Sequence, residues 1–560
     1  MKASLILALL ILFRLLAPPG TGAGPSTAAF EFGPEGLRSV RSQGVELLKK
    51  GTPYVEFFMA QEGGEIKATS PGQPAASFDA ASMTETVAYP WGSVACRYLP
   101  AKDRLGIEVT MTNRSTQPIF HVSLNLLELH LPSAPVGRGW DQSHVQCSSS
   151  DGVAAVLADY GSGAVSVTGE SFAEDYTVGF FKLSGQAASD LGVNLSTLSQ
   201  RASDTYHQDF PLPAGATKKI EVSLRFGPAG STLGGTTGDL YRRFGKAFPR
   251  KLDWPDRRPI AEVLLSSPAA QHHSPQNPRG WLNDPKLDAM GLHDRGAFRQ
   301  RMLRWADDCV KNLKAMNAQG MILWDVEGEQ MPHPTTFIGD PREAPKFAPE
   351  MDAIADELFA KFRKAELRTG VCIRPSRIRP NLDKSAPIPV VHDNMAFDPV
   401  EEMSAKIDYA KKRWGCTLFY VDSNVTWAFA AGTDPSAHKV ISWPMRADMF
   451  RRLAVKHPDA LIIPELPLLG YYSHTATYRE LQGGITSTPG EALLAYPGAF
   501  SVIKVEDEKL VEAHRAELVA GVRRGDILLF PGWYNPPVNG KVRQIYQQAQ
   551  ERKEEGRSKK

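Results

Sequence analysis

The sequence predicts two domains in series, an antiparallel β-sandwich followed by a (β/α)8 barrel. The 560 residues exceed the usual size of one domain. Residues 28–228 show short strand patterns separated by turns, whereas from Ala261 short apolar runs alternate with amphipathic helical stretches. Eight such alternations in about 270 residues match the size of a (β/α)8 barrel, and an open parallel sheet is the alternative fold.

The composition is that of an ordinary globular chain. Hydrophobic residues make up 42% and charged residues 22%, which excludes a disordered chain, collagen and a coiled coil. The 64 Lys and Arg residues nearly balance the 62 Asp and Glu residues. A net charge of +2 provides no strong field for nucleic acid, so we expect no nucleic-acid partner.

Residues 1–23 have the layout of a secretory signal peptide. Lys2 precedes the apolar run 5–13, a helix break follows at 18–20, and small residues place the cleavage site near Ala23. A membrane anchor is the alternative, but Arg14 interrupts an apolar run that is too short to span a bilayer. We therefore expect a secreted or periplasmic protein with no membrane span in the mature chain.

The expected sandwich is followed by a connector over residues 229–260. The strand patterns of the sandwich include 54–59, 106–112, 119–124, 164–168 and 219–226. Cys96 and Cys147 both fall in this region and can pair in an oxidising compartment. The connector is basic and contains proline, and we expect one short helix around 240–246.

The barrel elements follow in chain order over residues 261–533. Expected strands are 262–265, 320–326, 367–373, 417–421, 460–464, 484–486, 500–505 and 526–530. Expected helices are 297–316, 349–365, 399–413, 443–456, 491–495 and 508–523. Residues 534–560 are polar and charged, so we expect a C-terminal tail whose last part has no fixed structure.

Polar and aromatic residues gather just after the expected barrel strands. The active site of a barrel lies at the carboxyl ends of its strands, where the βα loops converge. The residues in these positions are Trp324, Asp325, Glu327, Arg374, Arg377, Asp422, Asn424, Trp427, Glu465, Lys504, Glu506, Asp507, Trp533 and Tyr534. A single carboxylate after a strand often caps a helix or faces water, so the set is more informative than any member.

Carboxylate pairs beside aromatic rings suit sugar chemistry. One carboxylate attacks or stabilises the anomeric carbon and the other protonates the leaving oxygen, while aromatic faces contact the C–H side of a pyranose. We predict Asp422 as nucleophile and Glu465 as acid/base. The alternatives are a turn-capping role for Asp422 and an ion pair of Glu465 with Arg374 or Arg377. The predicted substrate-binding residues are Trp324, Asp325, Glu327, Arg374, Asn424, Trp427, Glu506 and Trp533.

The motif FYVDSN over residues 419–424, at the end of strand four in a barrel behind a β-sandwich, resembles the α-galactosidase and α-glucosidase clan of glycoside hydrolases. The resemblance implies that Asp422 is the nucleophile. It places the acid/base after strand six, where residues 484–491 read GITSTPGE without an Asp, and clan members carry a further β-domain after the barrel. Acids after strands four, five and seven (Asp422, Glu465, and Glu506 or Asp507) follow the α-amylase clan instead, but its local motifs are absent.

Three functional hypotheses follow. The first is a secreted retaining glycosidase acting on an oligo- or polysaccharide. The second is a carbohydrate-binding protein that keeps the barrel without catalysis. The third is a metal-assisted hydrolase using Asp325, Glu327 and a histidine. No CxxC or HExxH motif and no phosphate-binding glycine loop is seen, so we expect no metal and no cofactor; the oligomeric state is left open.

Overall fold

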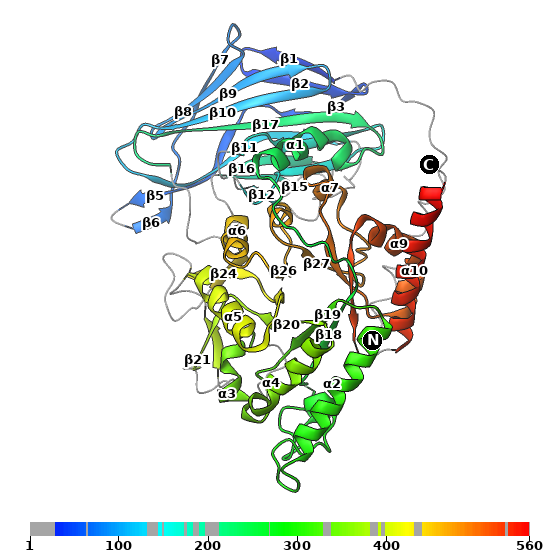
Figure 1. The fold of residues 1–560 in the computed structure, drawn as a ribbon. Helices are drawn as coiled ribbons and strands as arrows, with labels where there is room; N and C mark the ends of the chain where they lie inside the picture. Colours follow the sequence, from blue (N-terminus) through cyan, green and yellow to red (C-terminus); the bar gives the residue numbers. More distant parts are fainter. Residues whose placement is uncertain are drawn as a thin grey trace. The chain divides into compact units, whose positions relative to one another are not determined.

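The computed structural model describes residues 28–62, 65–131, 144–147, 150–172, 176–182, 190–196, 212–267, 269–328, 338–380, 390–393, 398–429, 440–532 and 536–558. The chain forms two compact units (Figure 1). The first extends to Thr237, and the second runs from Gly238 to the C-terminus and includes the segment Ser148–Val153. The predicted signal peptide lies outside the described residues. In the described part, no helix is both long and apolar enough to cross a membrane.

The first unit is an antiparallel β-sandwich, as predicted. One seven-stranded sheet runs in the order β13 (Ala155–Asp159), β14 (Gly163–Gly169), β17 (Thr217–Pro228), β10 (Arg104–Asn113), β9 (Gly92–Ala101), β8 (Thr84–Tyr89) and β7 (Ala75–Asp79). The other contains β12 (His144–Cys147), β15 (Tyr176–Lys182), β16 (Asp190–Ser196), β11 (Ile119–His130), β5 (Tyr54–Glu62) and β6 (Glu65–Ala68), with β4 (Leu48–Lys50) paired to β11. A small sheet comprises β1 (Ala28–Gly33), β2 (Gly36–Ser42) and β3 (Val45–Glu46).

The two large sheets share one hydrophobic core. Val94 of one sheet and Val122 of the other belong to the same buried cluster, which requires the sheets to pack face to face. Cys96 lies in this core as a fully buried free thiol, and burial raises its pKa. The disulfide that the sequence left open between Cys96 and Cys147 is therefore not formed.

The second unit contains the predicted (β/α)8 barrel. Its strands in chain order are β18 (Ile260–Leu264), β19 (Gly320–Trp324), β20 (Arg368–Ile373), β23 (Leu418–Val421), β26 (Leu461–Pro464), β27 (Thr477–Glu480), β28 (Ser501–Lys504) and β29 (Ile527–Pro531). They form one parallel sheet in the order β26-β23-β20-β19-β18-β29-β28-β27. Between its two edges, the N–H of Ala476 donates to the carbonyl of Ile462 at 3.2 Å. The ring is thus nearly closed.

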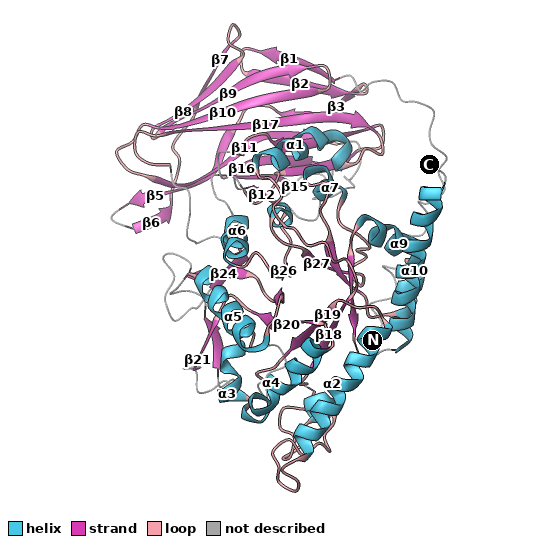
Figure 2. Ribbon diagram, viewed as in Figure 1, coloured by secondary structure: helices cyan, strands magenta, loops and turns pink. Residues whose placement is uncertain are grey.

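Helices surround these strands (Figure 2). They are α2 (Ala297–Ala315), α3 (Ala344–Phe347), α4 (Pro349–Lys364), α5 (Pro399–Trp414), α6 (Ala447–Lys456), α7 (Gly490–Ala495), α8 (Glu508–Ala513), α9 (Arg515–Arg524) and α10 (Pro536–Ser558), with α1 (Leu233–Ala247) before the barrel. Further elements are the hairpins β21 (Arg377–Pro380) with β22 (Val390–Asp393) and β24 (Val425–Phe429) with β25 (Val440–Pro444), and the short turn η5 (Leu469–Ser473). Local sequence explains α5: Asp398 caps its first turn, Pro399 begins it, and Gly415 ends it at a φ of 69°.

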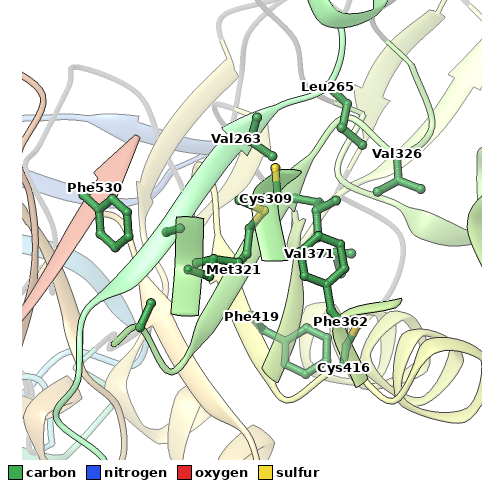
Figure 3. Close-up of a cluster of buried hydrophobic side chains, with 14 of the residues drawn as sticks. Val263, Leu265, Cys309, Met321, Val326, Phe362, Val371, Cys416, Phe419 and Phe530 are labelled. Atoms are coloured by element: carbon green, nitrogen blue, oxygen red, sulfur yellow. The ribbon is translucent and has the colours of Figure 1, made fainter. Parts of the chain in front are cut away.

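Strand residues alternate between two environments. Met321, Val371 and Phe419 point outward and pack with helix residues such as Cys309 and Phe362 (Figure 3). Their strand neighbours Ile322, Cys372 and Tyr420 belong to a separate cluster that fills the barrel interior. The two-residue period of a strand produces this division. The alternation therefore decides which residues beyond each strand end face the barrel axis.

The amino ends of the strands are closed by a tryptophan from the connector. Trp254 is buried in the interior cluster, and its indole N–H donates to the Gln319 side-chain oxygen at 3.1 Å. The carboxyl ends of the strands are consequently the side at which a site can form.

Two predictions about the barrel region are wrong. Strand six is Thr477–Glu480 rather than 484–486, because Gly484 lies in a turn with a φ of 75°. The expected C-terminal tail is instead the helix α10. Its Val538, Val542 and Ile545 are fully buried in the barrel's outer cluster, and their helical spacing gives α10 an apolar face.

Candidate active site

The strand alternation directs a set of polar side chains into the carboxyl end of the barrel. Every second side chain of a strand points to the same face. Counting from the strand residues of the interior cluster therefore places these side chains on the interior side. They are Glu262, Trp324, Arg374, Asp422, Glu465, Glu480, Lys504 and Glu506. They come from all strands except β29, so the closed ring gathers residues that are distant in sequence.

Asp422 is held by a buried guanidinium. Nε of Arg374 donates to Oδ2 of Asp422 at 2.5 Å, and Nη2 of Arg374 contacts the same oxygen. Asp422 is 7% exposed and Arg374 is 9% exposed. The backbone N–H of Asp422 also donates to the carbonyl of Ile373 at 2.9 Å, which fixes the start of the loop. The charge of the carboxylate is thus balanced in a site with little solvent.

Glu465 lies beside Asp422, so the structure brings the two predicted catalytic residues together. Burial raises the pKa of Glu465, and the negative charge of Asp422 and a hydrogen bond between the two carboxyl groups raise it further. The N–H of Ser423 donates to Oε2 of Glu465 at 2.7 Å and acts in the opposite direction. Asp422 is therefore paired with a cation, whereas Glu465 retains its proton to a higher pH than an ordinary glutamic acid.

The loops that follow strands two and four contain left-handed backbone. Asp325 has a φ of 61° and Ser423 a φ of 48°, although neither is glycine. Such conformations cost about 1 kcal/mol or more and are often found at functional sites. Asp325 is only 3% exposed; burial raises the pKa of the Cys372 thiol, and the charge of Asp422 and, less strongly, that of Asp325 raise it further.

Asn424 is not placed to bind a sugar. It is fully buried; its amide nitrogen donates to the Leu466 carbonyl at 3.1 Å and to the Tyr471 hydroxyl at 3.3 Å. Its amide oxygen accepts from the N–H of Leu466 at 2.7 Å. Asn424 therefore joins the loop after Asp422 to the loop after Glu465, and its predicted substrate-binding role is corrected to a structural one.

Glu327 is also enclosed by protein. It is 3% exposed and accepts the N–H of Asp340 at 2.7 Å, while burial raises its pKa to about 7. Nearby, Lys406 of α5 is fully buried and donates to the carbonyls of Gly339, Arg374 and Ser376 at 3.2, 2.8 and 2.6 Å. Lys406 thus fixes the backbone of the arginine that holds Asp422.

Aromatic rings line the barrel interior beneath the carboxylates. The rings of Trp324 and Tyr420 lie 4.8 Å apart between centroids, and Tyr420 meets Tyr478 nearly perpendicularly at 5.1 Å. The Tyr478 hydroxyl donates to Oε1 of Glu480 at 2.6 Å. The sequence analysis did not identify Glu480 because it misplaced strand six. With the correct bounds, strand six ends in an acid, Glu480.

A second charged group lies on strands one and seven. Nζ of Lys504 lies 3.3 Å from both Oε1 of Glu262 and Oε2 of Glu506. The side-chain amide of Gln482 donates to Glu506 at 2.6 Å. Both carboxylate oxygens of Glu506 are thus contacted by protein groups, whereas Glu262 is almost fully buried and burial raises its pKa.

The remaining predicted residues give less information. The side chain of Trp427, on β24, and all of Trp533 lie outside the described residues. Arg377 pairs with Glu402 at 2.6 Å rather than with Glu465. No group of three His, Cys, Asp or Glu side chains suited to a metal ion occurs in the described parts of the chain.

Comparisons with known proteins show a likeness of fold. No protein-family model matches the sequence, and no curated protein matches it. Among solved structures, an α-N-acetylgalactosaminidase from Bifidobacterium bifidum in complex with GalNAc has a TM-score of 0.50 at 10% identity, covering 94% of this chain and 92% of that one. A GH36 α-galactosidase from Geobacillus stearothermophilus has a TM-score of 0.44 at 10% identity, covering 95% of this chain and 75% of that one. The former likeness supports the sandwich-plus-barrel architecture over nearly the whole chain.

Proposed function

We propose that this chain is a glycoside hydrolase that cleaves an oligo- or polysaccharide by a retaining, two-carboxylate mechanism. The observation that supports this proposal is the pair of carboxyl groups of Asp422 and Glu465 at the carboxyl end of the barrel. Asp422 is bound by Arg374, whereas the pKa of Glu465 is raised. Hydrolysis of a glycosidic bond requires one ionised carboxylate and one protonated carboxyl group at the same site. Asp422, paired with Arg374, supplies the first.

In this mechanism Asp422 attacks the anomeric carbon and forms a covalent glycosyl-enzyme, which water then hydrolyses. Arg374 holds the nucleophile in position. Glu465 is our first choice as the group that protonates the leaving oxygen, because its pKa is raised. The rings of Trp324 and Tyr420 offer apolar surface near the C–H groups of a sugar.

Glu480 is the rival acid. The hydrogen bond between Glu465 and Asp422 brings the two carboxyl groups closer than the roughly 5–5.5 Å of typical retaining pairs. Glu480 ends strand six, is exposed, and is oriented by Tyr478. If Glu480 protonates the leaving group, Glu465 binds a sugar hydroxyl beside the nucleophile.

The substrate we propose to test first is an α-galactoside or an α-N-acetylgalactosaminide, because enzymes named for these sugars share the fold. Purified protein is incubated with aryl glycosides of both sugars and with a broader glycoside panel. Asp422→Asn is expected to lower turnover by about a thousandfold or more while the protein stays folded. Normal activity of this variant would reject Asp422 as nucleophile. Glycan binding without hydrolysis by the wild type would favour a carbohydrate-binding protein.

The two acid candidates are distinguished by leaving-group dependence. A variant that lacks the true acid hydrolyses dinitrophenyl glycosides, whose leaving group needs no protonation, far better than ordinary aryl glycosides. Azide also restores its activity by replacing water at the glycosyl-enzyme. Glu465→Gln and Glu480→Gln are compared in both assays. We expect this pattern in one variant and a uniform loss on both substrates in the other.

We also propose that the protein is secreted or periplasmic after removal of residues 1–23. The basis is the sequence pattern of Lys2, the apolar run and Ala23. Expression of the full chain in a secreting host, followed by N-terminal sequencing of the exported protein, tests this. A mature protein that still begins at Met1 would reject the cleavage.

A further inference from the structure

A pocket of about 220 Å³ lies in the barrel unit away from the candidate active site. Its walls come from the last residue of α1 and the segment that follows it to Lys251, from Ser150, from the first turns of α6, and from the end of η5 with the following His474. No barrel strand contributes to the lining. None of the residues that line the pocket belongs to the candidate active site.

The lining carries an excess of positive charge. Lys251, Arg451 and His474 all face the pocket. Burial, together with the smaller effect of the charges of Arg451, Lys251 and the adjacent Arg250, lowers the pKa of His474 to about 4. His474 is therefore neutral near pH 7, and Lys251 and Arg451 are the two cations of the lining.

Acidic groups near the pocket do not neutralise these cations. Asp448 also lines the pocket, and it lies 3.8 Å from Arg446. Asp151 lies 4.0 Å from the same arginine and accepts the first N–H of α6, from Ala447, at 2.6 Å. Within the described residues, no carboxylate lies within ion-pairing distance of Lys251 or Arg451.

The rest of the lining is mostly apolar. Ala247, Phe248, Pro249 and Ala447 form this surface, with the hydroxyl of Ser473 beside His474 at 2.7 Å from Nδ1. A concave apolar surface with a few convergent polar groups is the usual form of a small-molecule site. The pocket has room for a ligand the size of a substituted benzene or a single sugar ring.

We propose that this pocket binds a small organic anion, with its carboxylate or phosphate between Lys251, Arg451 and His474 and its apolar body against Phe248. The two cations of the lining, Lys251 and Arg451, outnumber its one carboxylate, Asp448, and the bound anion balances the difference. His474 gains a proton more easily once the anion is bound, because the anion opposes the repulsion from the neighbouring cations.

Benzoate and phenyl phosphate serve as probes, with neutral benzamide as the matched uncharged compound. Titration calorimetry on the full-length chain is expected to show saturable one-to-one binding of at least one anion and none of benzamide. Binding should weaken with added salt, as for a charge-driven complex. In NMR spectra of histidine-labelled protein, the bound anion should shift the His474 titration to higher pH.

The double variant Lys251→Gln, Arg451→Gln is expected to weaken binding by at least tenfold. Both side chains are exposed, so the fold should be retained. Arg452→Gln is the control, because this neighbouring α6 arginine pairs with Asp398 and does not line the pocket. Binding of benzoate alone or phenyl phosphate alone identifies the anionic group. Absence of saturable binding, equal binding of benzamide, or undiminished affinity of the double variant would overturn the proposal. None of these outcomes depends on glycosidase activity.

Discussion

Glu327 should make the stability of the barrel depend on pH. Its carboxyl group is 3% exposed, and burial raises its pKa from 4.5 to about 7. Because the pKa is higher in the folded chain, the stabilising contribution is complete below about pH 4.5 and is lost as the pH rises to about 7. A difference of about 2.5 pKa units corresponds to about 3 kcal/mol. Most of that loss falls between pH 5 and pH 8.

The variant Glu327→Gln removes the titration and keeps an oxygen that can accept the N–H of Asp340. Between pH 5 and pH 8 the wild-type barrel should lose about 2–3 kcal/mol more unfolding free energy than the variant. Because the chain has two units, a single unfolding curve is not a safe measure. Hydrogen exchange of slowly exchanging barrel peptides, followed by mass spectrometry at both pH values, reports the barrel directly.

Glu85 provides the matched control in the sandwich. It is fully buried, its pKa is also raised by burial to about 7, and it accepts a hydrogen bond from the Tyr98 hydroxyl at 2.8 Å. Glu85→Gln should alter the pH dependence of sandwich peptides and leave barrel peptides unchanged. Parallel pH dependence of barrel protection in wild type and Glu327→Gln would refute the reasoning.

Three further predictions concern packing and positioning. Lys406→Met leaves three backbone carbonyls without their donor. Because Arg374 is then held less firmly against the nucleophile, kinetics on folded protein should show a lower kcat with little change in KM, whereas an unchanged kcat would indicate a purely structural role. Gly370→Ala would place a Cβ 2.0 Å from the carbonyl oxygen of Leu418; soluble yield and melting temperature should fall sharply, and wild-type values would contradict the strand register. Ile545→Ala removes a fully buried side chain of α10 and should lower the stability of the barrel by about 2–5 kcal/mol, measured by hydrogen exchange of slowly exchanging barrel peptides, against a negligible loss if the helix were a solvated tail.

The barrel could be predicted because its strands are short apolar runs at regular intervals. The same runs predicted that Asp422 and Glu465 would meet, since the carboxyl ends of parallel strands converge. Strand six was not recognised because three of the four residues of Thr477–Glu480 are polar, so the strand lacks a continuous apolar run. The acid at its end was missed for that reason alone.

Other features depend on contacts that no local pattern contains. Asn424 looked like a ligand at the end of strand four, but its partners come from the loop after strand five. Lys406 lies in a helix, and only the folded chain brings the carbonyls of Gly339, Arg374 and Ser376 to it. Most residues of α10 are polar or charged, and only a narrow face of the helix is apolar. The composition of this segment therefore indicated a tail.

The cysteines have a practical consequence for producing the protein. The chain has five, and four of them, Cys96, Cys309, Cys372 and Cys416, are buried free thiols. Burial raises the pKa of each of these four thiols, which keeps them in the unreactive protonated form. An intrachain disulfide needs two cysteines, so neither unit relies on one. Recombinant chain lacking its first 23 residues should therefore fold in a reducing bacterial cytosol and tolerate dithiothreitol throughout purification.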